Sequence, residues 1–378
     1  MCNTMIGLFC AQHENWEEML TAAPYHLKIS RDDGYIMFKY DQIHSNFAFS
    51  LVQEARGIIF KEGQWDKPVC WAFNKFGNYG ESYVPEIDWS TAFVTEKVDG
   101  SLIKLWYDCG CWHISTNGTI DAYKAPLNDI KYDSFGDYFI DTCKKYYPYE
   151  SDLVDQLDPD LTYMFELVGP SNRVVVPYEE SKIYFLGARN NLSGAEFICN
   201  SFVAACLGVD RFERPKQYPL TSLEECIKVA EEFDWQQEGF VVCDGYFNRV
   251  KVKSPAYILA HYARNNNVIT KKHLIKVVLA NEVEEFICYA SDYKEEVLQC
   301  IAEMKKLIWL GIHSLNFCNK FKEMPRKDYA EMVKACPAPY WDFLFRNYNQ
   351  EISIKDYVSK WTPEKWEDAI NQLNKEIK

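Results

Sequence analysis

One lysine of this 378-residue chain, Lys97, is placed where its amine could act as a nucleophile. It ends one apolar stretch and is followed by Asp99-Gly100, a turn signal, and by a second apolar stretch at residues 102–107. A lysine held beside a tight turn between two strands is presented rigidly. An amine that burial or nearby cations deprotonate attacks electrophiles near neutral pH. The pattern suggests covalent catalysis through Lys97, although a hairpin turn with a solvated lysine beside it fits the same residues.

A second candidate is a row of cations at residues 249–253, where Arg or Lys alternates strictly with Val. In a strand, the two-residue period puts the three cations on one face: Arg249, Lys251 and Lys253. The Asp-Gly pair at residues 244–245 predicts a hairpin that joins this strand to the one that Glu238 opens. The row is either an exposed sheet face or a phosphate cradle with an acid nearby to hold a metal.

Three further side chains stand out by their surroundings. Glu166 lies inside an apolar run at residues 163–168, where burial is costly unless the carboxylate meets a cation, a metal or a hydroxyl. Arg56 stands at the entry to a predicted strand, and Lys75 lies in a loop rich in glycine, asparagine and aromatic residues. Each of these two cations alone is more often a surface side chain than a ligand contact.

The charge distribution limits how a polyanion could bind. The formal net charge is −14, which argues against a nucleic-acid binder coated in lysine. Residues 1–250 hold 21 Lys+Arg and 38 Asp+Glu, a balance of −17, whereas residues 251–378 hold 20 and 17, a balance of +3. A polyanion must therefore meet a local cationic site or the less acidic C-terminal part of the chain.

Membrane and secretion signals are not expected. The chain has no window of about 18 apolar residues. Its first 20 residues carry three glutamates and lack the basic region of a signal peptide. The 14 cysteines include no Cys-x-x-Cys pair. We expect a monomeric cytoplasmic protein with reduced thiols and no membrane partner, in the host cytoplasm if it is viral.

Residues 30–255 have the pattern of short strands separated by turn signals. The strands are predicted at residues 57–60, 111–115, 161–168, 172–177, 182–186 and 239–243. Two helices interrupt them, near residues 137–147 and 223–233, and Thr221 with Glu224 forms a capping-box pattern before the second. The pattern predicts an α+β fold with a largely antiparallel sheet.

After Pro255 the apolar residues take helical spacing. One apolar stripe over about five turns is best explained as core. It consists of Val297, Ile301, Met304, Ile308, Ile312 and Leu315. Thr362-Pro363 combines an N-cap with a first-turn proline and predicts a final helix to about residue 378. We therefore expect two domains, at residues 1–255 and 256–378.

Several segments in a fixed order carry a family resemblance. They lie at residues 54–60, 75–81, 96–102, 165–175, 238–242 and 250–254. In this order and spacing the chain resembles the covalent nucleotidyltransferases, which include polynucleotide ligases and mRNA capping enzymes. It is most similar to the ATP-dependent RNA ligase 1 family of T-even phages, the tRNA-repair ligases. The combination is far more specific than the residues around Lys97 alone.

The resemblance implies a fold and an activity. The fold is an antiparallel-sheet nucleotidyltransferase (adenylation) domain at residues 1–255, followed by an all-helical domain at residues 256–378 that is a candidate for RNA-substrate specificity. The activity is ATP-dependent joining of 5′-phosphate and 3′-hydroxyl RNA ends through lysyl-AMP and an RNA-adenylate. The substrates implied are ATP and RNA, as single-stranded ends or a broken tRNA anticodon loop, with Mg²⁺ or Mn²⁺ as the metal.

The resemblance also assigns roles to the cations. Lys97 is the nucleophile that takes AMP from ATP. Lys251 and Lys253 contact the nucleotide phosphates, with Lys251 close to the α-phosphate. Arg56 and Lys75 contact phosphates from the upstream edge of the cleft.

The remaining assignments are carboxylates and walls of the nucleotide site. Glu166 binds the ribose hydroxyls and, with Glu238, is a metal ligand. Glu96, next to the nucleophile, is assigned to nucleotide binding, and Val241 forms part of the apolar wall against adenine. Tyr257 matches a family aromatic residue just after the last segment.

One position departs from the family. A basic residue usually precedes the glycine of the segment at residues 115–119, and here that residue is Asn117. An amide donates a hydrogen bond but carries no charge, so ATP affinity or metal dependence is expected to differ. Other readings remain: a DNA ligase, a GTP-using capping enzyme, or a catalytically silent RNA-binding homologue. The helical tail favours RNA ligase over the first two, in which an OB-fold is usual.

Overall fold

A computed structural model describes residues 4–263, 269–349 and 351–376. The chain divides into two compact units, Met1–His261 (unit 1) and Tyr262–Lys378 (unit 2). The division falls within α8 (Pro255–Ala263), six residues after position 255, near which the sequence pattern changes.

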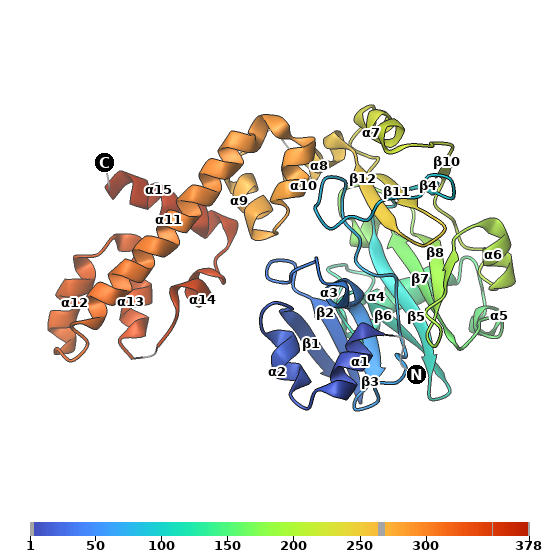
Figure 1. Cartoon of the computed structure of the whole chain (residues 1–378), viewed down its shortest axis with the longest axis horizontal. Coiled ribbons are helices and arrows are strands. Elements are labelled where there is room, and N and C mark those ends of the chain that lie inside the picture. Colours follow the sequence, from blue (N-terminus) through green and yellow to red (C-terminus); the bar gives the residue numbers. More distant parts are fainter. Residues whose placement is uncertain (1–3, 264–268, 350, 377–378) are drawn as a thin grey trace. The chain divides into compact units, whose positions relative to one another are not determined.

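Unit 1 contains three antiparallel sheets (Figure 1). The first has the order β1-β2-β3: β1 (Leu27–Asp32), β2 (Tyr35–Tyr40) and β3 (Arg56–Lys61). The second has the order β10-β4-β11-β12: β10 (Gln217–Tyr218), β4 (Phe93–Glu96), β11 (Gly239–Cys243) and β12 (Arg249–Lys253). The third has the order β6-β5-β7-β8-β9: β6 (Cys111–Thr116), β5 (Ser101–Asp108), β7 (Leu161–Val168), β8 (Lys182–Asn190) and β9 (Glu196–Ile198).

α-Helices (α) and short 3-10 helices (η) connect these strands. They are α1 (Met5–Gln12), α2 (Trp16–Thr21), α3 (Ser50–Glu54), η1 (Ala122–Lys124), α4 (Phe135–Cys143), α5 (Glu150–Val154), η2 (Pro170–Asn172), α6 (Ser201–Cys206) and α7 (Leu223–Glu231). The strands near residues 57–60, 111–115, 161–168, 182–186 and 239–243 are confirmed. β8 extends four residues beyond its predicted end.

The central strand β7 separates a hydrophobic core from the side that carries chemistry. Tyr163 and Phe165 are buried in the core that α4 covers through Phe139. Because side chains alternate along a strand, Met164 and Glu166 point to the opposite face. Glu166 is the one residue of β7 that keeps partial exposure.

The second sheet likewise has one face buried in a core and one face partly exposed. Phe240 and Val250 pack with Cys226 of α7 in a core, whereas the alternate residues Val241 and Lys251 are partly exposed on the other face. The predicted alternation of the cationic row is therefore confirmed, as is its pairing with the strand after Glu238.

Two local predictions in unit 1 are wrong. The helix predicted from residue 223 is capped by Ser222, whose hydroxyl accepts from the Glu225 amide, and not by Thr221. Residues 172–177 do not form a strand: η2 ends at Asn172, and the following residues have no strand pairing. The amides of Val175 and Val176 in this segment donate to the Asp99 carboxylate instead.

All elements that the structure describes in unit 2 are helical. They are α9 (Lys271–Leu279), α10 (Val283–Tyr289), η3 (Ser291–Tyr293), α11 (Lys294–Asn319), α12 (Arg326–Lys334), η4 (Ala338–Tyr340), α13 (Trp341–Asn347), α14 (Ile354–Val358) and α15 (Pro363–Glu376). Thr362 caps α15 by accepting from the Lys365 amide. The final helix is thus confirmed as far as residue 376, and its last two predicted residues lie outside the described ranges.

The buried face of α11 differs from the apolar stripe that we predicted. Its buried residues are Val297, Cys300, Met304, Leu307, Gly311, Ser314 and Cys318, whereas Ile312 is 39% exposed. Small residues lie on this face because other segments approach closely: a Cβ at Gly311 would lie 2.7 Å from Ile354 Cγ1. Close packing, more than hydrophobicity, selects the inner face of this helix.

The predicted fold class is confirmed: an α+β unit with antiparallel sheets precedes a helical unit. The twelve cysteines whose side chains are described are free thiols, and they pair in no disulfide. Within the described ranges, no helix is both long enough and apolar enough to span a membrane.

Candidate active site

A pocket of about 160 Å³ in unit 1 is lined by the second and third sheets together with β3. It brings together seven of the residues singled out from the sequence: Arg56, Glu96, Lys97, Glu166, Val241, Arg249 and Lys251. The apolar part of its lining includes Phe73, Phe76, Phe93 and Leu186. The pocket therefore combines cations, carboxylates and apolar walls, as a site for a charged ligand with an aromatic part requires.

Lys97 lies on a connection between two sheets. β4 ends at Glu96 in the second sheet, and β5 begins at Ser101 in the third, so the segment is not the tight turn between paired strands that the sequence suggested. The Lys97 amide donates to the Gly239 carbonyl at 2.8 Å. Gly100 permits the crossing, since a Cβ there would lie 2.5 Å from the Leu167 carbonyl oxygen. The backbone of both sheets thus fixes the lysine.

The Lys97 ammonium is paired with a buried carboxylate. Its Nζ lies 2.7 Å from Oε1 of Glu238, and the Lys253 Nζ lies 3.9 Å from the same oxygen. The Glu238 side chain is 5% exposed and that of Lys97 is 23% exposed. The Glu238 carboxylate balances the charge of the Lys97 ammonium. It also lies close enough to accept a proton from the amine.

Glu166 has an unusual titration behaviour for a glutamate. Burial raises its pKa to about 7, the nearby Glu238 carboxylate acts in the same direction, and the Lys97 and Arg56 cations act against it. A carboxyl group that titrates near neutral pH inside a pocket is a typical feature of a functional site.

This pKa gives a testable pH dependence of stability. Between the ordinary pKa of 4.5 and about 7, the folded protein holds a proton on Glu166 that the unfolded chain releases. The contribution of this group is therefore fully present at low pH and is lost as the pH rises through 7. We expect the unfolding free energy of the wild type, measured relative to that of Glu166→Gln, to fall by about 2–3 kcal/mol from pH 5 to pH 8.

Urea titrations of both proteins across this range provide the measurement. Substitution of the exposed Glu180 by Gln controls for the change in net charge. A constant difference between wild type and Glu166→Gln would show that Glu166 keeps its ordinary titration in the folded protein.

Arg56 is held by aromatic side chains that the sequence analysis did not single out. Its guanidinium lies 4.6 Å from the centre of the Phe73 ring and 5.1 Å from that of Phe76. Its Nε is buried and has no hydrogen-bond partner among the residues that the structure describes. Stacking fixes the plane of the guanidinium and leaves donor capacity for a ligand. The aromatic residues flanking Lys75 in the sequence were the available signal.

Lys75 is not in the same pocket. It lines a neighbouring pocket of about 250 Å³, which shares Phe76 and Arg249 with the first. Its side chain is 8% exposed, and its ammonium lies 5.2 Å from the Phe47 ring centre and 5.7 Å from that of Tyr40. Lys75 could therefore reach only a ligand that extends beyond the first pocket.

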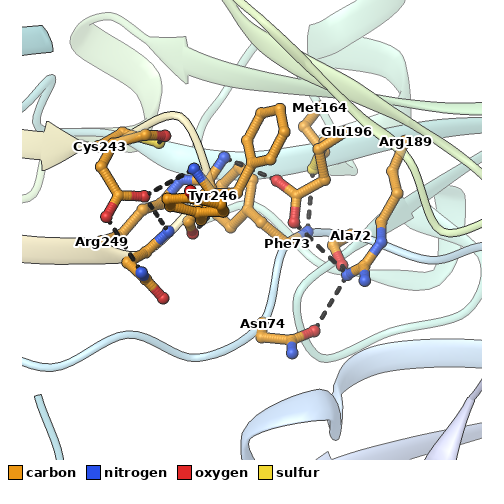
Figure 2. A network of polar contacts seen from close by, with 12 residues as sticks. Ala72, Phe73, Asn74, Met164, Arg189, Glu196, Cys243, Tyr246 and Arg249 are labelled. Atoms are coloured by element: carbon orange, nitrogen blue, oxygen red, sulfur yellow. Dashed lines mark hydrogen bonds and ion pairs between the residues drawn. The ribbon is translucent and has the colours of Figure 1, made fainter. Parts of the chain in front are cut away.

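Arg249, the first cation of the alternating row, is neutralised within the protein (Figure 2). Its guanidinium lies 2.7 Å from Glu196, which lies 3.7 Å from Arg189 on its other side. Arg189 also donates to the Ala72 carbonyl and to Asn74 at 3.0–3.1 Å. The network holds the loop that carries Phe73. Arg249 therefore helps to build the wall of the pocket and contributes little free positive charge to it.

Asp99 is another residue whose role the sequence did not reveal. Its side chain is 5% exposed; Oδ2 accepts from the amides of Val175 and Val176 at 2.9 and 2.7 Å, and Oδ1 accepts from the Tyr257 hydroxyl at 2.8 Å. These bonds replace the sheet pairing predicted for residues 172–177. Asp99 thus links the connection that carries Lys97 to the loop that follows β7 and to α8.

Within the described ranges, no group of three or more His, Cys, Asp or Glu side chains could hold a metal. Glu238 forms an ion pair with Lys97, and the charges of both residues act on the pKa of Glu166. Asn117 lies outside the lining of the first pocket, and its Oδ1 is buried without a hydrogen-bond partner among the described residues.

The antiparallel fold, with a lysine held between two sheets at a mixed polar and apolar pocket, has the features of a nucleotidyltransferase domain. The chain belongs to the RNA ligase family: the family model described as RNA ligase matches residues 54–257, just over half of the chain. The resemblance stated from the sequence is therefore confirmed.

Known relatives include viral proteins. A putative bifunctional polynucleotide kinase/RNA ligase of Autographa californica nuclear polyhedrosis virus is 28% identical over 274 residues, which cover 69% of this chain and 38% of that protein. The chain thus spans less than half the length of that relative. An RNA ligase of Rhodothermus phage RM378 is 28% identical over 337 residues, covering 71% of this chain and 73% of that protein.

A solved structure titled an archaeal ATP-dependent RNA ligase also aligns with the chain. The alignment has 12% sequence identity and a TM-score of 0.47, and covers 81% of this chain and 83% of that one.

Proposed function

We propose that the protein is an ATP-dependent RNA ligase that works through a lysyl-AMP intermediate on Lys97. The observation that carries the proposal is the Lys97 ammonium, paired with Glu238 at 2.7 Å and lining the same pocket as Arg56 and Lys251. A nucleophile between cations suits attack on a phosphate, and membership of the RNA ligase family supplies the reaction class.

In the first step, the Lys97 amine attacks the α-phosphate of ATP. The Nζ–P bond forms, the P–O bond to pyrophosphate breaks, and pyrophosphate leaves. The amine must lose a proton first, and Glu238 is the nearest group to accept it. Lys251 and Arg56 stabilise the negative charge on the phosphate oxygens, and Lys253 stays close to Glu238.

The walls of the pocket fit the rest of the nucleotide. Val241 and the phenylalanines of the lining offer an apolar surface for adenine. Glu166 on β7 and Glu96 on β4 offer acceptors for ribose hydroxyls. Lys75 in the adjoining pocket suits the distal phosphates or the incoming RNA phosphate.

The site suits a divalent metal that protein carboxylates and nucleotide phosphates would coordinate together. Mg²⁺ commonly binds through one or two carboxylates together with substrate phosphates and water, so the lack of a three-carboxylate group among the described residues is compatible with it. Glu166 and Glu238 are the carboxylates that would hold it. When bound, such a metal neutralises charge on phosphate oxygens.

The later steps join RNA ends. AMP passes from Lys97 to the 5′-phosphate of RNA, and a 3′-hydroxyl then attacks the activated phosphate and displaces AMP. We propose single-stranded ends, such as those of a broken tRNA anticodon loop, as the substrate, and a monomer in the cytoplasm as the working form. The basic balance of residues 251–378 supports an RNA contact in that part of the chain.

Intact mass spectrometry after incubation with ATP and Mg²⁺ tests the proposal. We expect an added mass of one AMP with ATP and none with GTP, because the family uses ATP. Mn²⁺ and pyrophosphatase should be included, since pyrophosphate reverses the step. No adduct under any of these conditions would favour a silent RNA-binding protein, and an adduct with GTP alone would favour a capping-type enzyme.

A further inference from the structure

The solvent-facing side of α11 carries large apolar side chains that the core does not use. Trp309 is 57% exposed, and Ile312 and Phe317 are each 39% exposed. They lie opposite the buried face of the helix, which includes Leu307 and Cys318. Contiguous exposed apolar side chains can form an interaction surface.

The aromatic residues follow one line along the helix. Trp309 and His313 are one turn apart, with ring centres at 3.9 Å, and Phe317 continues the same four-residue spacing. Phe317 in turn packs against Phe321, with ring centres at 5.2 Å. We name the set Trp309, His313 and Phe317 the α11 aromatic stripe.

The sequence stretch that carries the stripe has only positive formal charges, between Glu303 and Glu323. Residues 304–322 contain no Asp or Glu, in a chain whose net charge is −14. The same stretch contains four lysines: Lys305, Lys306, Lys320 and Lys322. Lys305, Lys306 and Lys320 are exposed, so cations lie at both ends of the stripe. This 19-residue stretch without carboxylates, in an otherwise acidic protein, suits the binding of an anion.

We propose that the α11 aromatic stripe binds single-stranded RNA, with unpaired bases stacking on its rings and the flanking lysines contacting phosphates. Aromatic rings beside lysines match this ligand, because every base offers a π face and every nucleotide a charge. A purely apolar protein partner would gain nothing from the lysines, and a duplex hides its bases. The inference rests on the proposed function, which makes RNA a substrate, and it assigns the contact to particular residues of unit 2.

The test compares RNA affinity among variants of the full chain. Fluorescence anisotropy with a labelled, unstructured RNA oligonucleotide should show about tenfold or greater weakening for the double variant Trp309→Ala with Phe317→Ala, as expected for lost stacking. Trp309→Tyr with Phe317→Tyr should keep most of the affinity, because the rings remain. Leu298→Ala is the matched control: it is 49% exposed on the same helix but lies outside the acid-free stretch.

Two further readouts separate the possible outcomes. Lysyl-AMP formation without RNA tests the nucleotidyl transfer independently, and we expect it to stay within about twofold of wild type, as for changes on an exposed helix face. Lys305→Gln with Lys306→Gln should reduce the dependence of RNA affinity on salt. Unchanged RNA affinity in the double alanine variant, or an equal loss for duplex RNA, would overturn the proposal. Absence of lysyl-AMP in the wild type would instead contradict the proposed function.

Discussion

Replacing Lys97 by alanine is expected to abolish the enzyme–AMP adduct completely. The substitution removes the amine that would form the Nζ–P bond, and the pocket lining holds one other lysine, Lys251, on a different strand. Lys97→Arg should give the same result, because a guanidinium stays protonated and cannot attack. Intact mass after incubation with ATP and Mg²⁺ is the measurement.

Two controls make the result specific. Lys228→Ala, at an exposed position on α7, should form the adduct at the wild-type rate. Lys97→Ala should still join RNA that already carries a 5′-adenylate, since that step needs no lysine–phosphorus bond; this shows that the variant is folded. A Lys97→Ala protein that forms the adduct like wild type would rule out the proposed intermediate.

Asp99→Ala is expected to produce a large loss of stability. The change removes a buried acceptor of three hydrogen bonds and leaves the amides of Val175 and Val176 without a partner. Buried donors that lose a charged acceptor cost free energy, so we expect the unfolding free energy to fall by about 3–5 kcal/mol. Urea denaturation followed by tryptophan fluorescence provides the measurement.

The Asp99 prediction has a partner variant with a smaller effect. Tyr257→Phe removes only the hydroxyl that donates to Asp99 Oδ1, so it should cost about 1.5–3 kcal/mol. In the double variant the two losses should not add, because the hydrogen bond between the two residues is counted in both. A full sum of the two effects, or an Asp99→Ala protein as stable as wild type, would contradict this account of the segment.

Repeating patterns along the chain were enough to predict much of the fold. Strict alternation predicted the buried valines and outward cations of β12, and the apolar run around Glu166 predicted a buried strand. These succeed because the period of an element determines which side chains share a face. The order of the motifs was likewise sufficient to identify the RNA ligase family, since those segments stand in the sequence itself.

The predictions that are wrong concern segments whose conformation or burial depends on contacts with distant parts of the chain. Residues 172–177 are as apolar as a strand, yet their amides bond to Asp99, more than 70 residues away. The predicted core stripe of α11 included Ile312, because hydrophobicity suggests burial. Close approach at Gly311 selects a face of small residues instead.

By itself, the sequence determined the classes of element, the family and the candidate residues of the site. The tertiary structure alone decided how those residues are paired: Lys97 after β4 with Glu238 before the neighbouring strand β11, and Arg249 with Glu196. It also placed Lys75 in the neighbouring pocket. The physical reason is that periodicity is local along the chain, whereas the partner of a charge depends on which other segments fold against it.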